Sequence, residues 1–107
     1  MHNVLGIHVS IANGLVNNKN LTVHCKSGDD NLGVHVLPFS KNFGWDFKRN
    51  IFGTTQFYCS FEWTGEFHWF DIYISRRDRC QVCNWVVSEK GPITQVGSGL
   101  VQYPWNK

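Results

Sequence analysis

Apolar and polar residues alternate along most of this chain, in short runs separated by glycine, asparagine, proline and charged residues. Alternation with a period of two places every second side chain on one face, so each run predicts a half-buried β-strand. No segment shows the 3.6-residue period of an amphipathic helix. The runs lie at residues 4–12, 21–25, 32–37, 43–48, 56–63, 66–74, 82–87, 93–96 and 100–103. The pattern predicts an all-β fold, an antiparallel β-sandwich of about eight strands.

The clearest hairpin is predicted at residues 56–74, around a tight turn at Thr64 and Gly65. Phe70, Ile72 and Ile74 should face the core from its second arm, against the inward residues of the first, which are Phe57, Cys59, Phe61 and Trp63. Three aromatic residues of the second arm should face the other way: Phe67, Trp69 and Tyr73. We also expect corners at residues 27–31 and 50–54, where glycine interrupts polar residues.

Length and charge exclude several classes of protein. A chain of 107 residues is one domain, here spanning residues 1–107. The net charge of +2 is mild and the basic residues are scattered, so we expect no nucleic-acid partner. No apolar run approaches the roughly 20 residues of a membrane helix, so we expect no membrane insertion. The chain opens without a signal-peptide pattern. We expect the mature form of a monomeric protein behind an added start methionine.

The four cysteines, Cys25, Cys59, Cys80 and Cys83, predict two disulfides and an oxidising compartment. Sequence does not choose among the three connectivities, but we disfavour Cys80 with Cys83 because so short a loop restrains little of the chain. Two long-range bridges are expected instead. Zinc is less favoured because only one Cys-x-x-Cys pair is present. Asn20 begins a glycosylation sequon, which also points to secretion.

No motif indicates catalysis, a metal or a cofactor. The five histidines lie in different predicted segments, and no nucleophile elbow or phosphate loop occurs. Asp29, Asp30 and Asn31 lack the oxygen spacing of a calcium loop and read as a solvated turn. We therefore expect no enzyme. The aromatic residues Phe67, Trp69 and Tyr73 suit either a second buried face or a surface that stacks on sugars.

Several blocks of the chain carry a family resemblance. They are HCKSGDDNLG at residues 24–33, WDF at 45–47, NIFGTT at 50–55, FYCSFEW at 57–63, FDIY at 70–73, RD at 77–78 and CNW at 83–85. Together they resemble the plant self-incompatibility S-protein family, the S-protein homologues, over almost the whole chain. The family usually carries a third aspartate where Asn31 stands, so this chain has one charge fewer at that turn.

The resemblance implies a small secreted plant protein with a signal peptide, two disulfides, a β-sandwich fold and no catalytic residues. Founding members of the family are pistil-secreted ligands of a pollen membrane protein, so the implied partner is a membrane receptor at a plant cell surface. Specificity would lie in surface loops, with candidate residues Asp29, Asp30, Asn31, Thr64, Gly65, Arg76, Arg77 and Arg79. The rival interpretations are a carbohydrate-binding module that uses Trp69 and Tyr73, and a defence protein that acts on membranes.

Overall fold

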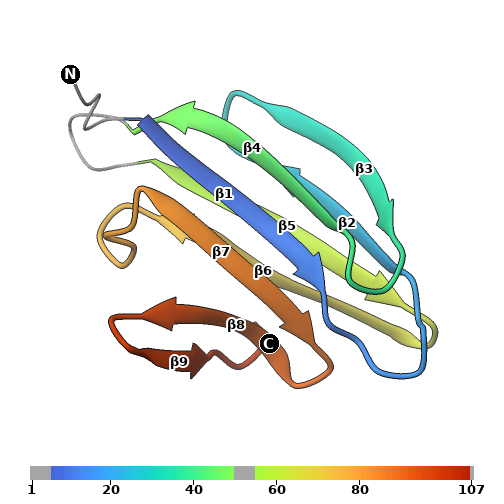
Figure 1. The fold of residues 1–107 in the computed structure, drawn as a ribbon. Coiled ribbons are helices and arrows are strands. Elements are labelled where there is room, and N and C mark those ends of the chain that lie inside the picture. Colours follow the sequence, from blue (N-terminus) through green and yellow to red (C-terminus); the bar gives the residue numbers. More distant parts are fainter. Residues whose placement is uncertain (1–5, 50–54, 107) are drawn as a thin grey trace.

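The computed structural model describes residues 6–49 and 55–106, and these residues form nine strands in two packed sheets (Figure 1). Sheet A has the order β4 (Asn42–Lys48), β1 (Gly6–Asn13), β7 (Val82–Ser88), β8 (Gly91–Val96) and β9 (Gly99–Gln102). Sheet B has the order β3 (Asn31–Leu37), β2 (Leu21–Lys26), β5 (Gln56–Trp63) and β6 (Glu66–Ile74). The expected all-β sandwich is confirmed. The expected corner at residues 50–54 lies outside the described residues.

One strand pair corrects the antiparallel prediction. Strand β7 lies parallel to β1, with Val9 opposite Cys83 and Ile11 opposite Trp85, so sheet A is mixed. The chain crosses between the sheets after β1, β3, β4 and β6, and the last crossing returns it to the end of the sandwich where β1 begins. From there β7 can only run in the same direction as β1. Local alternation carries no information on this direction.

The core lies between the two sheets, where the inward side chains of both meet. Strand β1 alternates half-buried and buried residues along its whole length, and β5 alternates in the same way from Phe57 to Trp63. Tyr73, Phe61 and Trp85 are among the largest fully buried side chains. The half-buried strands predicted at residues 4–12, 21–25 and 56–63 are therefore confirmed within the described residues.

A β-bulge changes the predicted face of Tyr73. Phe57 pairs with Tyr73 but Tyr58 pairs with Asp71, so β6 carries one more residue than β5 at this point. The extra residue breaks the period of two, and Ile72 and Tyr73 both become fully buried. The prediction that Tyr73 faces away from the core is wrong for this reason.

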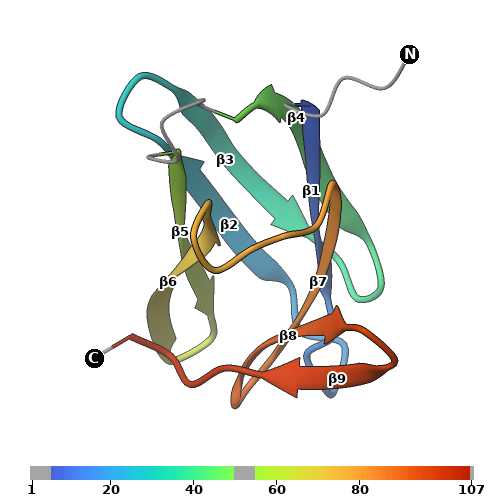
Figure 2. The ribbon, with the colours of Figure 1, turned by 90° about the vertical axis from the view of Figure 1, so that its left-hand side faces the viewer.

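The C-terminal segment closes the side of the sandwich between β9 and β6 (Figure 2). The Tyr103 amide donates to the Pro92 carbonyl at 2.9 Å, and the Asn106 amide donates to the Trp69 carbonyl at 3.3 Å. Between them, the Trp105 ring stacks on His68, with ring centroids 4.9 Å apart. Its indole Nε1 donates to the Glu89 carbonyl at 3.0 Å. The segment thus joins the two sheets.

Both disulfides are present, and one corrects an expectation. Cys25 and Cys59 lie directly opposite on β2 and β5, with Cα atoms 4.0 Å apart, and are bridged. Cys80 is bridged to Cys83, three residues later. We had disfavoured that pair and expected two long-range bridges. The strand register explains the difference, because it pairs Cys25 with Cys59 and leaves the other two cysteines together where β7 begins.

Candidate functional site

The candidate partner-binding loops lie at two opposite ends of the sandwich, because neighbouring strands of sheet B are antiparallel. The end that carries the β2–β3 turn, which we call the first end, also carries the loop between β6 and β7. The opposite end, the second end, carries the β5–β6 turn and the segment before β2. One continuous contact surface therefore cannot use all eight candidate residues. Asp29, Asp30, Asn31, Arg76, Arg77 and Arg79 lie at the first end, and Thr64 and Gly65 at the second.

The β2–β3 turn is held by its own hydrogen bonds. The Ser27 hydroxyl accepts from the Asp30 amide at 3.1 Å, and the Ser27 amide donates to the Asp30 carbonyl at 2.8 Å. The Asn31 side-chain oxygen accepts from the Gly33 amide at 2.9 Å and lies 2.8 Å from His24 Nε2. Asn31 is thus committed within the turn. The Asp29 and Asp30 side chains are exposed at its tip.

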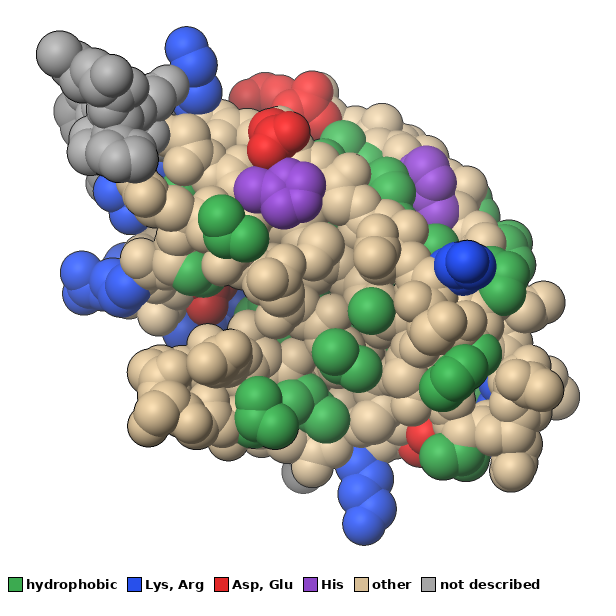
Figure 3. Space-filling model, in the orientation of Figure 1, with side chains coloured by type: hydrophobic (Ala, Val, Ile, Leu, Met, Phe, Trp, Pro, Cys, Tyr) green, Lys and Arg blue, Asp and Glu red, His purple; other side chains and the backbone are tan. Residues whose placement is uncertain are grey.

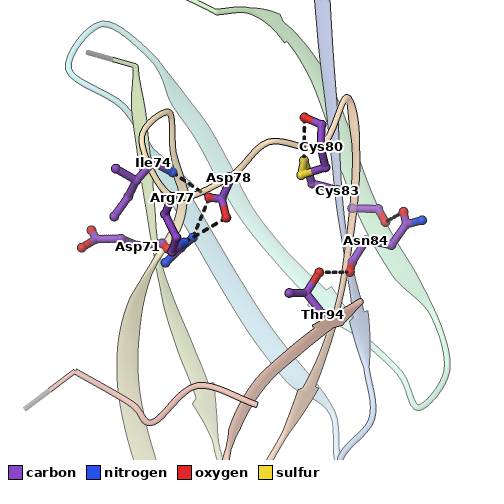
Figure 4. The surroundings of a disulfide bond; sticks show 9 residues. Asp71, Ile74, Arg77, Asp78, Cys80, Cys83, Asn84 and Thr94 are labelled. Carbon is purple, nitrogen blue, oxygen red and sulfur yellow. Dashed lines mark hydrogen bonds and ion pairs between the residues drawn. A yellow bond between two sulfur atoms is a disulfide. The ribbon is translucent and has the colours of Figure 1, made fainter. Parts of the chain in front are cut away.

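An internal ion pair organises the loop between β6 and β7 (Figure 4). Arg77 donates to both carboxylate oxygens of Asp78, from Nε at 2.9 Å and from Nη2 at 2.7 Å. Nη2 also donates to the Asp71 carbonyl at 2.8 Å, and the Ile74 amide donates to Asp78 at 2.8 Å. Asp78 is buried, so this pairing satisfies a charge held away from water. The loop is anchored before the chain reaches the Cys80–Cys83 bridge.

The Arg77 guanidinium also lies against three aromatic rings. Its central carbon is 5.0 Å from the Phe70 ring centroid, 5.4 Å from that of Trp85 and 5.2 Å from that of Tyr103. Each distance suits a cation–π interaction. Arg77 is therefore an internal anchor that joins β6, β7 and the C-terminal segment. Of the three arginines, Arg76 and Arg79 are exposed.

The second end carries a tight turn and the sequon. Thr64 and Gly65 are exposed, and Gly65 has a φ of 79°, a conformation that glycine adopts without strain. Asn20 is exposed in the segment just before β2, so its side chain is accessible for a glycan. Glycosylation of Asn20 remains a prediction.

The outer face of sheet B carries aromatic residues that the sequence patterns only half identified. Trp69 and Phe67 are exposed as predicted, whereas the third ring on this face is Tyr58, in place of the buried Tyr73. Tyr58, Phe67 and Trp69 line a hollow of about 320 Å³ together with His24, Lys26, Cys59 and Ser60. Alternation in 56–63 already set Tyr58 on the outer face. Only the strand register places it near Trp69.

The outer face of sheet A differs from that of sheet B. Figure 3 shows hydrophobic side chains scattered over this face, with no single gathered patch. His8 Nδ1 lies 2.8 Å from Asp46 Oδ1, and the Ser10 hydroxyl donates to the Asn84 side-chain oxygen at 2.6 Å. These contacts satisfy the polar groups of the face locally.

The described residues contain no metal-binding cluster and no nucleophilic triad. No group of three or more His, Cys, Asp and Glu side chains within 6–49 and 55–106 could hold a metal ion. The two His–carboxylate pairs, His8 with Asp46 and His68 with Glu66, have no hydroxyl or thiol hydrogen-bonded to the imidazole in this part of the chain. Such a donor is what a nucleophilic triad needs. None of the described residues forms a helix that could cross a membrane.

The molecule is thus a small β-sandwich with two disulfides, exposed turns at both ends and an aromatic hollow on one sheet. The sequence model described as plant self-incompatibility protein S1 matches residues 8–105. The chain belongs to this family of plant proteins.

Individual relatives agree with that assignment. S-protein homolog 5 of Arabidopsis thaliana is 40% identical over 93 residues, which cover 85% of this chain and 72% of the relative. S-protein homolog 3 of the same plant is 41% identical over 107 residues, covering 92% and 71%. A solved structure of self-incompatibility protein homologues matches with a TM-score of 0.68 and 20% identity, over 98% of both chains. That family is described as widespread, small, highly stable and secreted from plants.

Proposed function

We propose that this protein is a non-catalytic extracellular ligand that a protein receptor at a plant cell surface recognises. The observation that carries the proposal is membership of the self-incompatibility family, whose members are described as secreted. The disulfides suit an oxidising compartment, because all four cysteines are paired. A rigid sandwich that presents short polar turns is a common way to position recognition loops.

We place the receptor contact at the first end. The β2–β3 turn presents two carboxylates, Asp29 and Asp30, and the β6–β7 loop at the same end presents Arg76 and Arg79. Internal hydrogen bonds hold the backbone of both loops, so little conformational entropy is lost on binding. The second end carries Asn20, and a glycan there would cover the surface around Thr64 and Gly65.

The test is to crosslink the tagged protein to wall-free plant protoplasts and identify the captured proteins. The Asp29→Ala/Asp30→Ala and Arg76→Ala/Arg79→Ala variants should each reduce capture of the receptor about tenfold or more, since a few residues at the centre of a contact carry most of the binding energy. Thr64→Ala, in the exposed turn of the opposite end, is the matched control and should capture normally. Loss of capture in Thr64→Ala alone would move the contact to the second end. If no protein is captured in a saturable way, the receptor proposal is rejected.

A further inference from the structure

The outer face of sheet B is a regular grid of side chains that alternates aromatic and polar groups. Residues directly opposite on neighbouring strands share a face, so the strand register fixes which side chains are adjacent. Three rows cross β2, β5 and β6: Thr22–Glu62–Phe67, His24–Ser60–Trp69 and Lys26–Tyr58–Asp71. The middle of this grid is hollowed rather than flat, by about 320 Å³ between the rings and the polar groups.

Three aromatic rings border the hollow and remain accessible. Tyr58 is 38% exposed, Trp69 is 45% exposed and Phe67 is 64% exposed. Most of the other aromatic side chains that the structure describes are buried or half-buried. An exposed cluster of rings around a concavity is the usual form of a ligand site, and isolated exposed rings are not. The three rings come from β5 and β6, whereas His24 and Lys26 line the hollow from β2.

The polar groups of the hollow are available to a ligand. No residue of the described chain forms an ion pair with Lys26 or a hydrogen bond with the Ser60 hydroxyl. Asn31 holds the His24 ring in place through Nε2, so the ring's Nδ1 can contact a ligand. The lining includes Lys26 and His24 but no Asp or Glu. The rows place two carboxylates beside the lining residues, Glu62 opposite Phe67 and Asp71 opposite Tyr58, and Asp71 accepts a hydrogen bond from Gln56 at 2.9 Å.

We propose that this hollow binds a sugar ring that carries a carboxylate, as one unit of an acidic polysaccharide. The apolar face of a pyranose ring packs on aromatic rings such as Trp69 and Tyr58. Sugar hydroxyls need both donors and acceptors, which the Ser60 and Tyr58 hydroxyls supply. Lys26 complements the carboxylate, because it is a cation without an acidic partner in the hollow.

The shape of the hollow selects a polysaccharide over a protein partner. Protein contact surfaces are large and have an apolar centre, whereas this hollow is small, with rings from β5 and β6 on one side and His24 and Lys26 from β2 on the other. The hollow is also open to solvent, so a chain of sugars can continue beyond the bound ring. This site is separate from the first-end loops of the proposed receptor contact.

The test measures retardation of the folded protein in native gels that contain polygalacturonate, fully methyl-esterified polygalacturonate or dextran. The wild-type protein should be retarded by polygalacturonate, less by the esterified polymer and not by dextran. Trp69→Ala should weaken binding about tenfold, through loss of ring contact. Lys26→Gln should weaken binding to polygalacturonate about fivefold and bind the two galacturonan forms alike. The matched controls, Leu100→Ala on exposed β9 and Lys41→Gln in an exposed turn, should bind as wild type.

Each contrary outcome has a definite meaning. Equal binding of Trp69→Ala and wild type, with both folded by circular dichroism, would overturn the site. Equal binding of the two galacturonan forms by the wild-type protein would overturn the proposal that the site recognises a carboxylate. A Trp69→Ala protein that loses capture on wall-free protoplasts, with no polymer bound by the wild type, would show a protein interface and overturn the polysaccharide. The receptor proposal is tested apart, since it predicts normal protoplast capture by Trp69→Ala.

Discussion

A single buried asparagine holds together two loops at the second end. Asn13 is 1% exposed, and its side-chain nitrogen donates to the carbonyls of Lys19 at 2.7 Å and Leu37 at 2.8 Å. Its side-chain oxygen accepts from the Leu15 amide at 2.8 Å. The backbone carbonyl of Asn13 accepts from Ser40. One side chain therefore satisfies the buried backbone groups of two loops, which sequence alternation could not reveal.

Replacing Asn13 with alanine should lower the free energy of unfolding by about 2–4 kcal/mol, because it leaves buried carbonyl and amide groups without partners. Asn84→Ala is the matched control. Its side chain accepts one exposed hydrogen bond from Ser10, so its loss should cost less than about 1 kcal/mol. Guanidinium unfolding with the disulfides intact measures both. Similar losses in the two variants would contradict the role given to Asn13.

Arg77 is the second residue on which several elements depend. Lysine in its place keeps the charge but not the two-pronged bond to Asp78 or the planar contact with Phe70, Trp85 and Tyr103. Arg77→Lys should therefore lower stability by about 1–3 kcal/mol. Arg76→Lys, in the neighbouring exposed position, should change it by less than about 0.5 kcal/mol. Thermal unfolding of both proteins measures the two losses of stability. An Arg77→Lys protein as stable as wild type would show that the positive charge alone is enough to anchor the loop.

At the scale of strands, the two disulfides make unequal contributions. The Cys25–Cys59 bridge spans a sequence separation of 34 and crosses β2 to β5, whereas Cys80–Cys83 spans 3. In the chain-entropy relation, the long loop contributes about 4 kcal/mol and the short one about 2 kcal/mol. Unfolding of the Cys25→Ala/Cys59→Ala and Cys80→Ala/Cys83→Ala proteins should show that order. A larger loss from the short bridge would assign it a role in native packing instead.

The sequence predicted elements well and their partnerships poorly. Alternation set the inward faces of β1 and β5, because burial on one face imposes a period of two on the residues themselves. It failed at Tyr73, where the bulge adds a residue to β6 that no local pattern marks. The parallel direction of β7 and the pairing of Cys80 with Cys83 depend on which strands meet in space. The hollow beside Trp69 has the same origin, since it joins residues of three strands.

At the scale of the whole molecule, Glu89 joins three distant segments. Its carboxylate accepts from the Val16 amide at 3.0 Å and pairs with Lys19 at 3.3 Å, while its carbonyl accepts from Trp105. Burial raises the pKa of Glu89, but the hydrogen bonds from the Val16 amide, from its own amide and from Lys19, with the charge of Lys19, outweigh burial. The pKa of Glu89 therefore lies below its ordinary value of 4.5.

A lowered folded-state pKa means that the charged form of Glu89 stabilises the fold. The contribution is complete above the ordinary value of 4.5 and is lost as the pH falls through the lowered pKa. Glu89→Gln should lower stability at neutral pH by at most about 1 kcal/mol, because the ion pair is partly exposed. The difference from wild type should vanish in strong acid. Unfolding curves at a series of pH values measure it, and a difference that persists unchanged to low pH would contradict the assignment.

The central claim is that a protein at the plant cell surface recognises this chain. Saturation binding of the labelled protein to protoplasts, before and after protease treatment of the cells, tests it most directly. We predict saturable binding that wall removal preserves, that protease abolishes and that Asp29→Ala/Asp30→Ala weakens while Thr64→Ala does not. Binding that fails to saturate, or that survives protease treatment unchanged, would contradict recognition by a protein receptor.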